Sequence, residues 1–169
     1  MRVPRFVFWP LASLLILCDC ATKRAIEETE TPGVPHPIVD GVLRFTLEYN
    51  RGAAFSTHLG RYERFWLIAG GFAILSAMIY IYRDLMRRHA NWFAVTGAAL
   101  VVGGAIGNLL DRVRSPRGVV DFIDVGFNAS RFFIFNVADI GLSVGAVLLA
   151  IAVWRAEAAR GRRDGAAVR

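Results

Sequence analysis

Three long apolar stretches limit what this chain can fold into more than any other feature of its sequence. They run from Phe65 to Tyr82, from Trp92 to Leu110 and from Phe132 to Trp154, and Asp139 is the only charged residue among them. Each is about long enough to cross ~30 Å of hydrocarbon as an α-helix that rises ~1.5 Å per residue. None shows the polar stripe at helical spacing that a helix on a soluble core would carry. These stretches predict an integral membrane protein.

A shorter apolar stretch, from Phe6 to Cys18, follows two arginines near the start of the chain and resembles a secretory signal peptide. However, Leu17 stands directly before Cys18, where a lipoprotein cleavage site would have a small residue. No small-x-small cleavage site follows it either. We therefore predict a retained first membrane helix over about residues 5–22.

The basic residues orient the four predicted spans, because cytoplasmic loops carry the excess of lysine and arginine. They precede the first span, fill the connection between the second and third, and follow the fourth: Arg2, Arg5, Arg83, Arg87, Arg88, Arg155, Arg160, Arg162, Arg163 and Arg169. Both termini are therefore expected in the cytoplasm, and the connections 23–64 and 111–131 are expected outside. Arg112, Arg114 and Arg117 run against the rule, so we expect them to be held in the structure or to be functional.

This topology also accounts for the formal net charge of +6, so nucleic-acid binding is not needed to explain it. The length indicates one domain over residues 1–169. Its spans are predicted near residues 5–22, 65–82, 92–110 and 132–154. The basic cytoplasmic tail, over about residues 155–169, is expected to be poorly ordered.

The two external connections contain strand patterns. Polar and apolar residues alternate from Val42 to Tyr49, as in a half-buried strand, and Gly118 to Phe127 is a weaker second candidate. The acidic, proline-containing segment from Glu27 to Pro37 is interpreted as a loop. We predict an all-α membrane fold of four transmembrane helices, with a small external β-sheet (a cradle) formed by the two external loops. Small residues at four-residue spacing predict close helix packing in the third and fourth spans: Ala99, Gly103, Gly107, Gly141 and Gly145.

Asp139 places a carboxyl group inside a predicted span, where polar groups are costly and need a reason. It lies about seven residues into the fourth span, which corresponds to roughly 10 Å below the outer interface. No lysine or arginine lies within one helical turn of it along the sequence. Taken alone, Asp139 is equally well interpreted as a structural carboxyl group that hydrogen-bonds to a neighbouring helix.

Five polar clusters fall at the external ends of the spans. In the first, Asp19 and Lys23 have the i, i+4 spacing of an ion pair on one helix face. The other four are Asn50-Arg51-Gly52-Ala53-Ala54-Phe55, Gly103 to Arg112, Val119 to Asp124 and Phe135 to Asp139. The topology places all five at one membrane depth, although it was derived from charges elsewhere. We therefore interpret them as one site.

Asp121 and Asp139 are the candidate pair for chemistry at this site. Two carboxylates brought together at a low-dielectric boundary cannot both ionise cheaply, and they therefore share a proton. The ionised member can take a proton from water while the protonated member polarises a peptide carbonyl. Such a pair hydrolyses an amide without a metal or a covalent intermediate. Its titration belongs to the pair, so neither residue is assigned as the acid or the base.

Other hydrolytic chemistries fit less well. His36, His58 and His89 are scattered and form no HExxH or carboxylate–histidine cluster, so neither a metal nor a cofactor is expected. Lys23 is the only lysine, which leaves a serine–lysine dyad open. No serine lies in a motif that would face it, so we favour a structural ion pair between Lys23 and Asp19.

With these motifs in this order and separation, the chain resembles the lipoprotein signal peptidases, the signal peptidase II family. The resemblance extends from Asp19 to Asp139 and rests on Asp19-x-x-Thr22-Lys23, Asn50-x-Gly52-Ala53-Ala54-Phe55, Gly103-Gly104-Ala105-x-Gly107-Asn108-x-x-Asp111-Arg112, Val119-Val120-Asp121-Phe122 and Phe135-Asn136-x-Ala138-Asp139. Each motif is short, but five in register are specific. The family's two catalytic aspartates match Asp121 and Asp139. Its supporting positions match Asp19, Lys23, Asn50, Gly52, Gly107, Asn108, Arg112, Asn136 and Ala138.

The resemblance implies a membrane aspartyl endopeptidase that removes the signal peptide from prolipoproteins. The substrate would carry a diacylglyceryl group on its lipobox cysteine, and cleavage would fall on the amino side of that cysteine. The implied partners are these substrates and membrane lipids, and a monomer without a cofactor is expected. The implied location is the bacterial cytoplasmic (inner) membrane, with the active site at the external face. Two departures stand out: Phe132-Phe133-Ile134 where relatives often have Trp-Pro, and the acidic Glu27-Glu28-Thr29-Glu30.

A small proton-coupled transporter or channel subunit is the main alternative, with Asp139 and Asp19 as relay carboxyl groups. This alternative predicts polar residues that continue through the bilayer to the cytoplasm. The inner halves of the last two spans, Thr96 to Val102 and Val144 to Trp154, offer almost none. A non-enzymatic scaffold would explain the glycine spacing but not the polar clusters.

Overall fold

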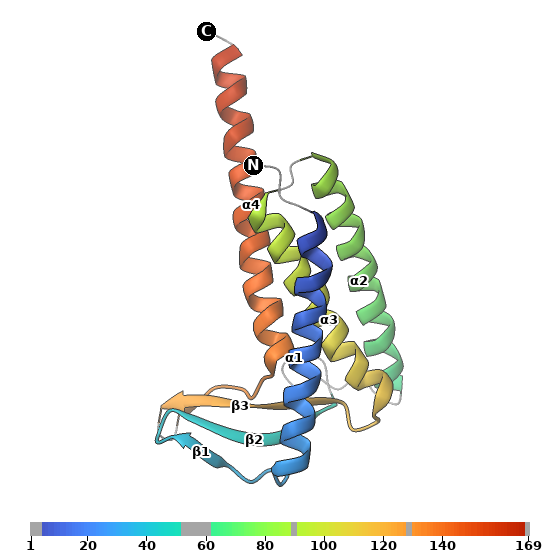
Figure 1. Cartoon of the computed structure of the whole chain (residues 1–169), viewed down its shortest axis with the longest axis vertical. Helices are drawn as coiled ribbons and strands as arrows, with labels where there is room; N and C mark the ends of the chain where they lie inside the picture. Colours follow the sequence, from blue (N-terminus) through green and yellow to red (C-terminus); the bar gives the residue numbers. More distant parts are fainter. Residues whose placement is uncertain (1–4, 52–61, 89–90, 128–129, 168–169) are drawn as a thin grey trace.

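A computed structural model describes residues 5–51, 62–88, 91–127 and 130–167. Within these ranges, four α-helices run side by side and an antiparallel sheet lies at one end of them (Figure 1). The helices are α1 (Phe8–Thr29, preceded by a 3-10 turn at Arg5–Val7), α2 (Glu63–Arg88), α3 (Trp92–Arg114) and α4 (Val137–Ala167). The strands are β1 (His36–Val39), β2 (Leu43–Asn50), β3 (Val119–Phe127) and β4 (Ser130–Arg131). The start of α1 and the end of α4 lie on the side away from the sheet.

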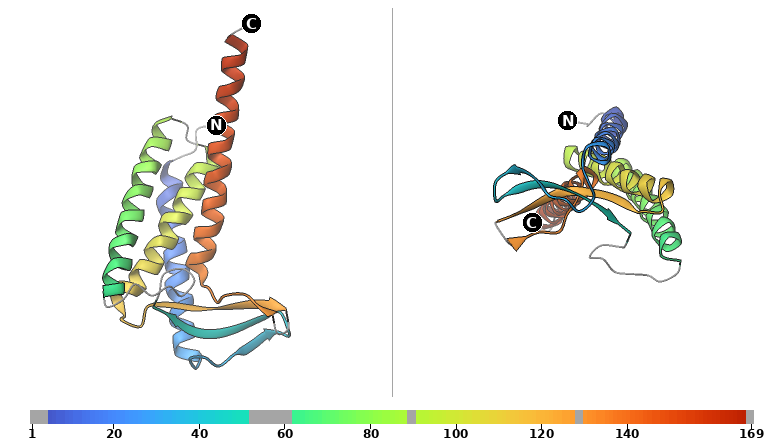
Figure 2. Two further views of the ribbon diagram at one scale, coloured as in Figure 1. Left: turned by 180° about the vertical axis from the view of Figure 1, so that it is seen from behind. Right: turned by 90° about the horizontal axis from the view of Figure 1, so that it is seen from below.

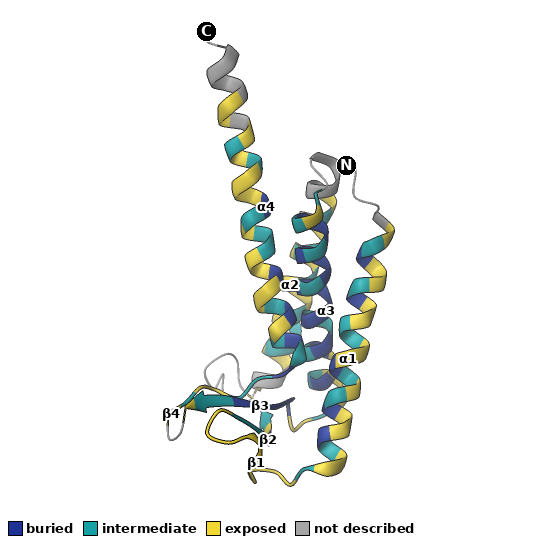
Figure 3. Ribbon diagram, turned by 60° about the vertical axis from the view of Figure 1, so that its left-hand side comes forward, coloured by how far each residue is buried: buried dark blue, intermediate teal, exposed yellow. Residues whose placement is uncertain are grey.

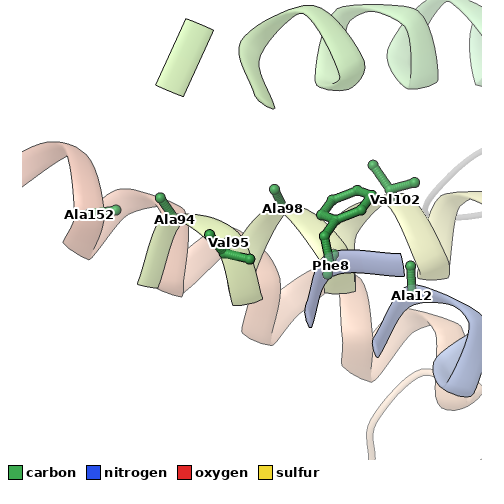
Figure 4. Close-up of a cluster of buried hydrophobic side chains, with 8 residues drawn as sticks. Phe8, Ala12, Ala94, Val95, Ala98, Val102 and Ala152 are labelled. Carbon is green, nitrogen blue, oxygen red and sulfur yellow. The ribbon is translucent and has the colours of Figure 1, made fainter. Parts of the chain in front are cut away.

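Helix α3 is the centre of the bundle, because it packs against each of the other three helices (Figure 2). Burial confirms this position, since α3 carries most of the buried residues of the bundle and α4 is largely exposed (Figure 3). Small and β-branched side chains surround the buried ring of Phe8 between the helices (Figure 4). This cluster consists of Phe8, Ala12, Ala94, Val95, Ala98, Ala99, Val102 and Ala152.

Glycine allows α3 and α4 to approach closely. A methyl group at Gly145 would lie 2.7 Å from the carbonyl oxygen of Gly97, and one at Gly97 would lie 2.8 Å from that of Gly145. A methyl group at Gly103 would lie 3.0 Å from the carbonyl oxygen of Ala12 in α1. The predicted packing through small residues is therefore confirmed, and the backbones are closer than any larger side chain would permit.

Two of the four helices, α3 and α4, are long and apolar enough to cross a membrane. In α4 only 22% of that apolar stretch is buried, and Ile140, Val144, Val147 and Val153 face outward. A soluble core helix buries such residues, whereas a helix in lipid leaves them on its surface. The helices predicted near residues 5–22 and 65–82 are present as α1 and α2, and α2 contains a shorter apolar stretch from Phe65 to Tyr80.

The sheet has the strand order β1-β2-β3-β4, with β2 and β3 as its central pair. The two predicted strands are confirmed as β2 and β3. The end of β2 pairs with the start of β3, where Glu48 lies opposite Asp121 and Tyr49 opposite Val120. Apolar residues of β2 and β3 pack against Ile26 at the end of α1, which fixes the sheet to the bundle. Strand β1 begins at His36 and so includes the end of the segment predicted as a loop.

The start of α4 differs from the prediction. Residues 132–136 are not helical, and Phe135 pairs with Ile123 of β3: its N–H donates to the Ile123 carbonyl at 3.1 Å, and its carbonyl accepts from the Ile123 N–H at 2.8 Å. Helix α4 therefore begins at Val137, and Asp139 lies in its first turn. The prediction that Asp139 lies seven residues inside a helix was wrong, because strand pairing takes up the apolar residues before it.

The ends of α1 and α4 also differ from the predictions. Helix α4 continues to Ala167, so the prediction of a poorly ordered tail was wrong for the residues that the structure describes. Alanine and arginine dominate this stretch, and both favour helix. Helix α1 runs to Thr29, beyond the span end expected near residue 22, and so reaches the level of the sheet.

Candidate functional site

Polar side chains from α1, α3, α4, β2 and β3 meet where the sheet joins the helices. The structure brings together nearly all of the predicted site residues there: Asp19, Lys23, Asn50, Gly107, Asn108, Arg112, Asp121, Asn136, Ala138 and Asp139. Gly52 and the following Ala53, Ala54 and Phe55 lie outside the described residues, as do His58 and His89.

A capping box positions Asp139. Asn136 directly precedes α4, and its side-chain oxygen accepts a hydrogen bond from the Asp139 backbone N–H at 3.0 Å. The Asp139 carboxylate in turn accepts from the Asn136 backbone N–H at 3.2 Å. This reciprocal pair satisfies two backbone donors that every helix start leaves without an intrahelical partner. The sequence Asn136-x-x-Asp139 therefore starts the helix and orients the carboxylate at once.

The same asparagine holds the second carboxylate. Because the Asn136 Oδ1 atom accepts from the Asp139 backbone, the Nδ2 atom must face the other way. It donates to Asp121 Oδ1 at 2.6 Å and to Asn108 Oδ1 at 3.1 Å. A single residue, which is fully buried, thus binds both Asp121 and Asp139.

Asp121 is almost fully buried, with 5% of its surface exposed. Its second oxygen accepts from Asn50 Nδ2 at 3.1 Å, across the β2–β3 pair. Burial, and next the negative charge of Asp139, raise the pKa of Asp121 to about 7 against the opposing effect of the hydrogen bonds from Asn50 and Asn136. The Asp121 carboxyl group can therefore exchange a proton near neutral pH.

Asp139 is more accessible, because it is only half-buried. Its Oδ1 atom accepts from Asn108 Nδ2 at 2.8 Å, so α3 fixes one oxygen while the capping box fixes the other. Arg112, one turn further along α3, donates to the Asn108 carbonyl at 3.2 Å. Its guanidinium also interacts electrostatically with both Asp121 and Asp139.

Lys23 anchors a second, fully buried cluster beside the first. Its ammonium group lies 2.8 Å from Asp19 Oδ2 and 2.8 Å from Asp111 Oδ2, and it donates to Asn108 Oδ1 at 3.0 Å. An ammonium group has three protons, and these three partners account for them. The predicted Asp19–Lys23 ion pair is therefore confirmed, and no serine is among the contacts of Lys23 that the structure describes.

Two small residues make room for the Lys23 cluster. The Ala138 backbone N–H donates to Asp19 Oδ1 at 2.9 Å, which ties α4 to α1. A methyl group at Gly107 would lie 2.6 Å from Asp19 Oδ2 and would displace that carboxylate. Ala138 thus contributes its backbone N–H group, and Gly107 contributes the space that a side chain would fill.

Three features of the site were missed from the sequence. Asp111 lies in one of the predicted polar clusters but was given no role, yet it binds Lys23 and also accepts from the Val120 backbone N–H at 3.3 Å. The capping box was missed, although Asn136-x-x-Asp139 is a recognisable helix-start signal. Arg114 and Arg117, which run against the charge rule, form ion pairs with Glu27. The sequence gives no signal for that contact, because it joins segments far apart in the chain.

The part of the chain that the structure describes holds no cluster of three or more histidine, cysteine or acidic residues arranged to bind a metal. The chemistry available at the site is therefore that of two linked carboxyl groups, neutral amides and nearby cations. One carboxyl group is buried and titrates near neutrality, and the other is open enough to meet water or a ligand.

The sequence and the fold were compared with known proteins. A family model described as "Signal peptidase (SPase) II" matches residues 11–155. A lipoprotein signal peptidase of Oleidesulfovibrio alaskensis is 36% identical and covers 92% of this chain and 99% of its own length. One of Ectopseudomonas mendocina is 37% identical over 88% of this chain and 89% of its own length. A solved structure described as a bacterial membrane enzyme superposes with a TM-score of 0.76, at 31% identity and 88% coverage of each chain.

Proposed function

Because this chain belongs to the signal peptidase II family, whose members cleave signal peptides from prolipoproteins, we propose that it does so as an aspartyl endopeptidase with Asp121 and Asp139 as its catalytic residues. One observation carries the assignment: a single buried asparagine, Asn136, binds both carboxyl groups. Among the described residues, no other asparagine is seen to bind two aspartates in this way.

The proposed reaction uses the proton that the two carboxyl groups share. The ionised member takes a proton from a water molecule, whose oxygen attacks the carbonyl carbon of the scissile bond. The protonated member gives its proton to the carbonyl oxygen, which forms a neutral tetrahedral intermediate. When the C–N bond breaks, the leaving nitrogen takes a proton from the pair and leaves as an amine. A hydroxyl group of the intermediate gives its proton back to the pair as the new carboxyl group forms. The pair ends with one proton, as it began, and its titration belongs to both residues.

The neighbouring residues support this reaction in distinct ways. Asn50 and Asn136 hold Asp121, and Asn108 holds Asp139. Lys23, with Asp19 and Asp111, fixes Asn108 in turn. Arg112 adds positive charge near both aspartates, which favours negative charge that develops on the substrate.

We propose that all four helices cross the membrane and that the two termini are cytoplasmic. The single domain of residues 1–169 would then carry its sheet on the external side, because the sheet lies at the opposite end from the start of α1 and the end of α4. Asp139, in the first turn of α4, would lie at the external interface. A cysteine held at that depth by a diacylglyceryl group would present its preceding peptide bond to the pair. We propose that a monomer suffices, since the catalytic residues all come from one chain.

The test is cleavage of a diacylglyceryl-modified prolipoprotein by the purified protein in detergent. Asp121→Asn and Asp139→Asn are assayed beside the wild type, and a thermal melt checks that each variant is folded. We expect signal-peptide release by the wild type and a loss of roughly 10³-fold or more in each variant. Near wild-type cleavage by a folded Asn variant would show that the aspartate concerned is structural.

The same samples test the transporter alternative. If the wild type leaves the substrate intact, the protein is reconstituted in vesicles and proton flux is measured. Proton flux that is lost in Asp139→Asn would replace the peptidase proposal with a relay function.

A further inference from the structure

Glu27 joins three elements of the structure beside the proposed active site. It lies in the last turn of α1, and its Oε1 atom accepts from the Tyr49 hydroxyl at 3.2 Å and from Arg117 at 3.1 Å. Its Oε2 atom accepts from Arg114 at 3.3 Å. The carboxylate therefore connects α1 with the end of β2 and with the turn that leads from α3 to β3.

Arg117 and Tyr49 also bind each other. One guanidinium nitrogen donates to the Tyr49 hydroxyl at 2.7 Å, and the guanidinium carbon lies 4.2 Å from the centre of the Tyr49 ring. Hydrogen bonding and cation–π attraction act together in this contact. The tyrosine is thus held at its hydroxyl by Glu27 and Arg117 and over its ring by Arg117.

Tyr49 lies next to the residues that set the environment of Asp121. It pairs with Val120 in the β2–β3 register, and its neighbour Asn50 donates to Asp121 Oδ2 at 3.1 Å. Asn50 is the last residue of β2 and pairs with Val119 of β3. Tyr49 directly precedes it in the strand, so the placement of Tyr49 contributes to the placement of the Asn50 amide.

We propose that Glu27, with Tyr49 and Arg117, forms a positioning cluster that fixes the end of β2 so that Asn50 can donate to Asp121. This inference rests on the proposed peptidase function. Glu27 is a positioning residue, because it acts on the reacting carboxyl group only through Tyr49 and Asn50.

The surroundings of Glu27 separate it from an ordinary surface charge. Its side chain is only 19% exposed, and it accepts three hydrogen bonds. The neighbouring Glu28 is 63% exposed and pairs only with Arg24, which is 77% exposed, one turn back on the same helix. Exposed pairs of that kind contribute little. Glu28→Gln is therefore a matched control, since it makes the same chemical change one residue away.

The cluster predicts two effects of Glu27→Gln. Looser placement of Asn50 should lower kcat for cleavage of the diacylglyceryl-modified prolipoprotein by roughly three- to tenfold, with a smaller change in KM. The Asn50 hydrogen bond lowers the pKa of Asp121, so weakening it should raise that pKa. Loss of the Asp121 proton takes the last shared proton from the pair, so the basic limb of the pH–rate profile should then move to higher pH by about half a unit.

A purely structural role would destabilise the protein without moving the pH profile, so the profile is the decisive measurement. Tyr49→Phe removes only the hydroxyl group, keeps the ring packed, and should shift the profile in the same direction by less. Arg117→Gln should produce a similar shift, and the double variant with Glu27→Gln should show less than the sum of the two single effects.

Each outcome supports or overturns the inference. A shifted profile in Glu27→Gln and Tyr49→Phe, with Glu28→Gln like the wild type, supports it. Unchanged kcat and profile in both variants overturn it while leaving the peptidase function intact. If the wild type and Glu28→Gln are themselves inactive on this substrate, the proposed function fails instead, and the inference fails with it.

Discussion

Strand β3 carries two buried aspartates, three residues apart, that behave in opposite ways. Asp121 is 5% exposed and Asp124 is 1% exposed, so both lose most of their contact with water. The partners of Asp121 are the neutral amides of Asn50 and Asn136, and its pKa rises to about 7. Burial also acts to raise the pKa of Asp124, but hydrogen bonds from Arg44, Arg131 and Thr46 outweigh it and hold that pKa below its usual value.

The difference shows that the charge of the partner, and not burial alone, decides whether a carboxyl group can titrate. Asp124 has two guanidinium groups beside it and remains ionised as part of the sheet. Asp121 has a second carboxylate nearby and no ion pair of its own among the described residues. We assign structure to the first and chemistry to the second. The following predictions test that separation, from the largest expected effect to the smallest.

Lys23→Met extends the comparison to the buried ion cluster of α1. The substitution leaves Asp19 and Asp111 buried without their cation, so we expect a loss of about 3–5 kcal/mol in the free energy of unfolding. A thermal melt in detergent measures it. Expressed as a free energy, the loss of cleavage per folded molecule should be smaller than the loss of stability. Full folding with abolished cleavage would instead return Lys23 to the list of catalytic candidates.

Asn136→Ala removes the residue that binds both proposed catalytic carboxyl groups. We expect kcat/KM for prolipoprotein cleavage to fall roughly 10²–10³-fold, because the pair loses its common hydrogen-bonding partner. Helix α4 also loses its cap, so folding is checked by circular dichroism. Asn136→Asp, which keeps an acceptor for the Asp139 N–H, should retain the helix start. Activity close to that of the wild type in Asn136→Ala would contradict the proposed role.

Asp124→Asn should lower stability and spare cleavage, whereas Asp121→Asn should abolish cleavage. It leaves Arg131 without its carboxylate, and we expect about 2–3 kcal/mol of destabilisation. Cleavage by the remaining folded protein should stay within roughly threefold of the wild type, since Asp124 has no contact with the pair. Loss of cleavage without loss of stability would show that the two aspartates have been assigned the wrong way round.

At pH 8 the change in Tm should have opposite signs in the Asn variants of the two aspartates. The pKa of Asp121 is raised on folding, so its ionisation costs stability as pH rises from about 4 to about 7. Asp121→Asn should therefore raise Tm by roughly 5 °C at pH 8, and the gain should disappear near pH 4. Asp124 stabilises the fold while it is ionised, so Asp124→Asn should lower Tm at pH 8. That loss should shrink only below about pH 4, where the carboxyl group becomes protonated first in the unfolded chain and then, at lower pH, in the folded one.

Much of this architecture could be predicted because its signals are local. The apolar stretches predicted the helices, and alternation predicted β2 and β3. The start of α4 could not be predicted in this way, because Phe132 and Phe133 are as apolar as a helix in lipid. Pairing between Phe135 and Ile123, which are close in space, keeps that segment out of the helix. The end of α4 was misjudged for a different reason, since helix propensity was given too little weight against charge.

The features of the site also divide into those with a local sequence signal and those without one. Motifs identified its members, and i, i+4 spacing identified the Asp19–Lys23 pair. The contacts of Glu27 with Tyr49 and Arg117 depend on α1 continuing past the sheet, and no local pattern indicates that length. The link between Asp121 and Asp139 through Asn136 likewise depends on β3 and the start of α4 lying side by side.

The capping box at Asn136 and Asp139 has a consequence for mutational scanning. The atoms that begin α4 are the same atoms that orient Asp139. Replacement of Asp139 by alanine removes the acceptor for the Asn136 N–H together with the proposed catalytic group, so a loss of activity would mix helix initiation with chemistry. Replacement by asparagine keeps an acceptor oxygen at that place in the first turn. The isosteric change therefore keeps helix initiation apart from chemistry, which the change to alanine does not.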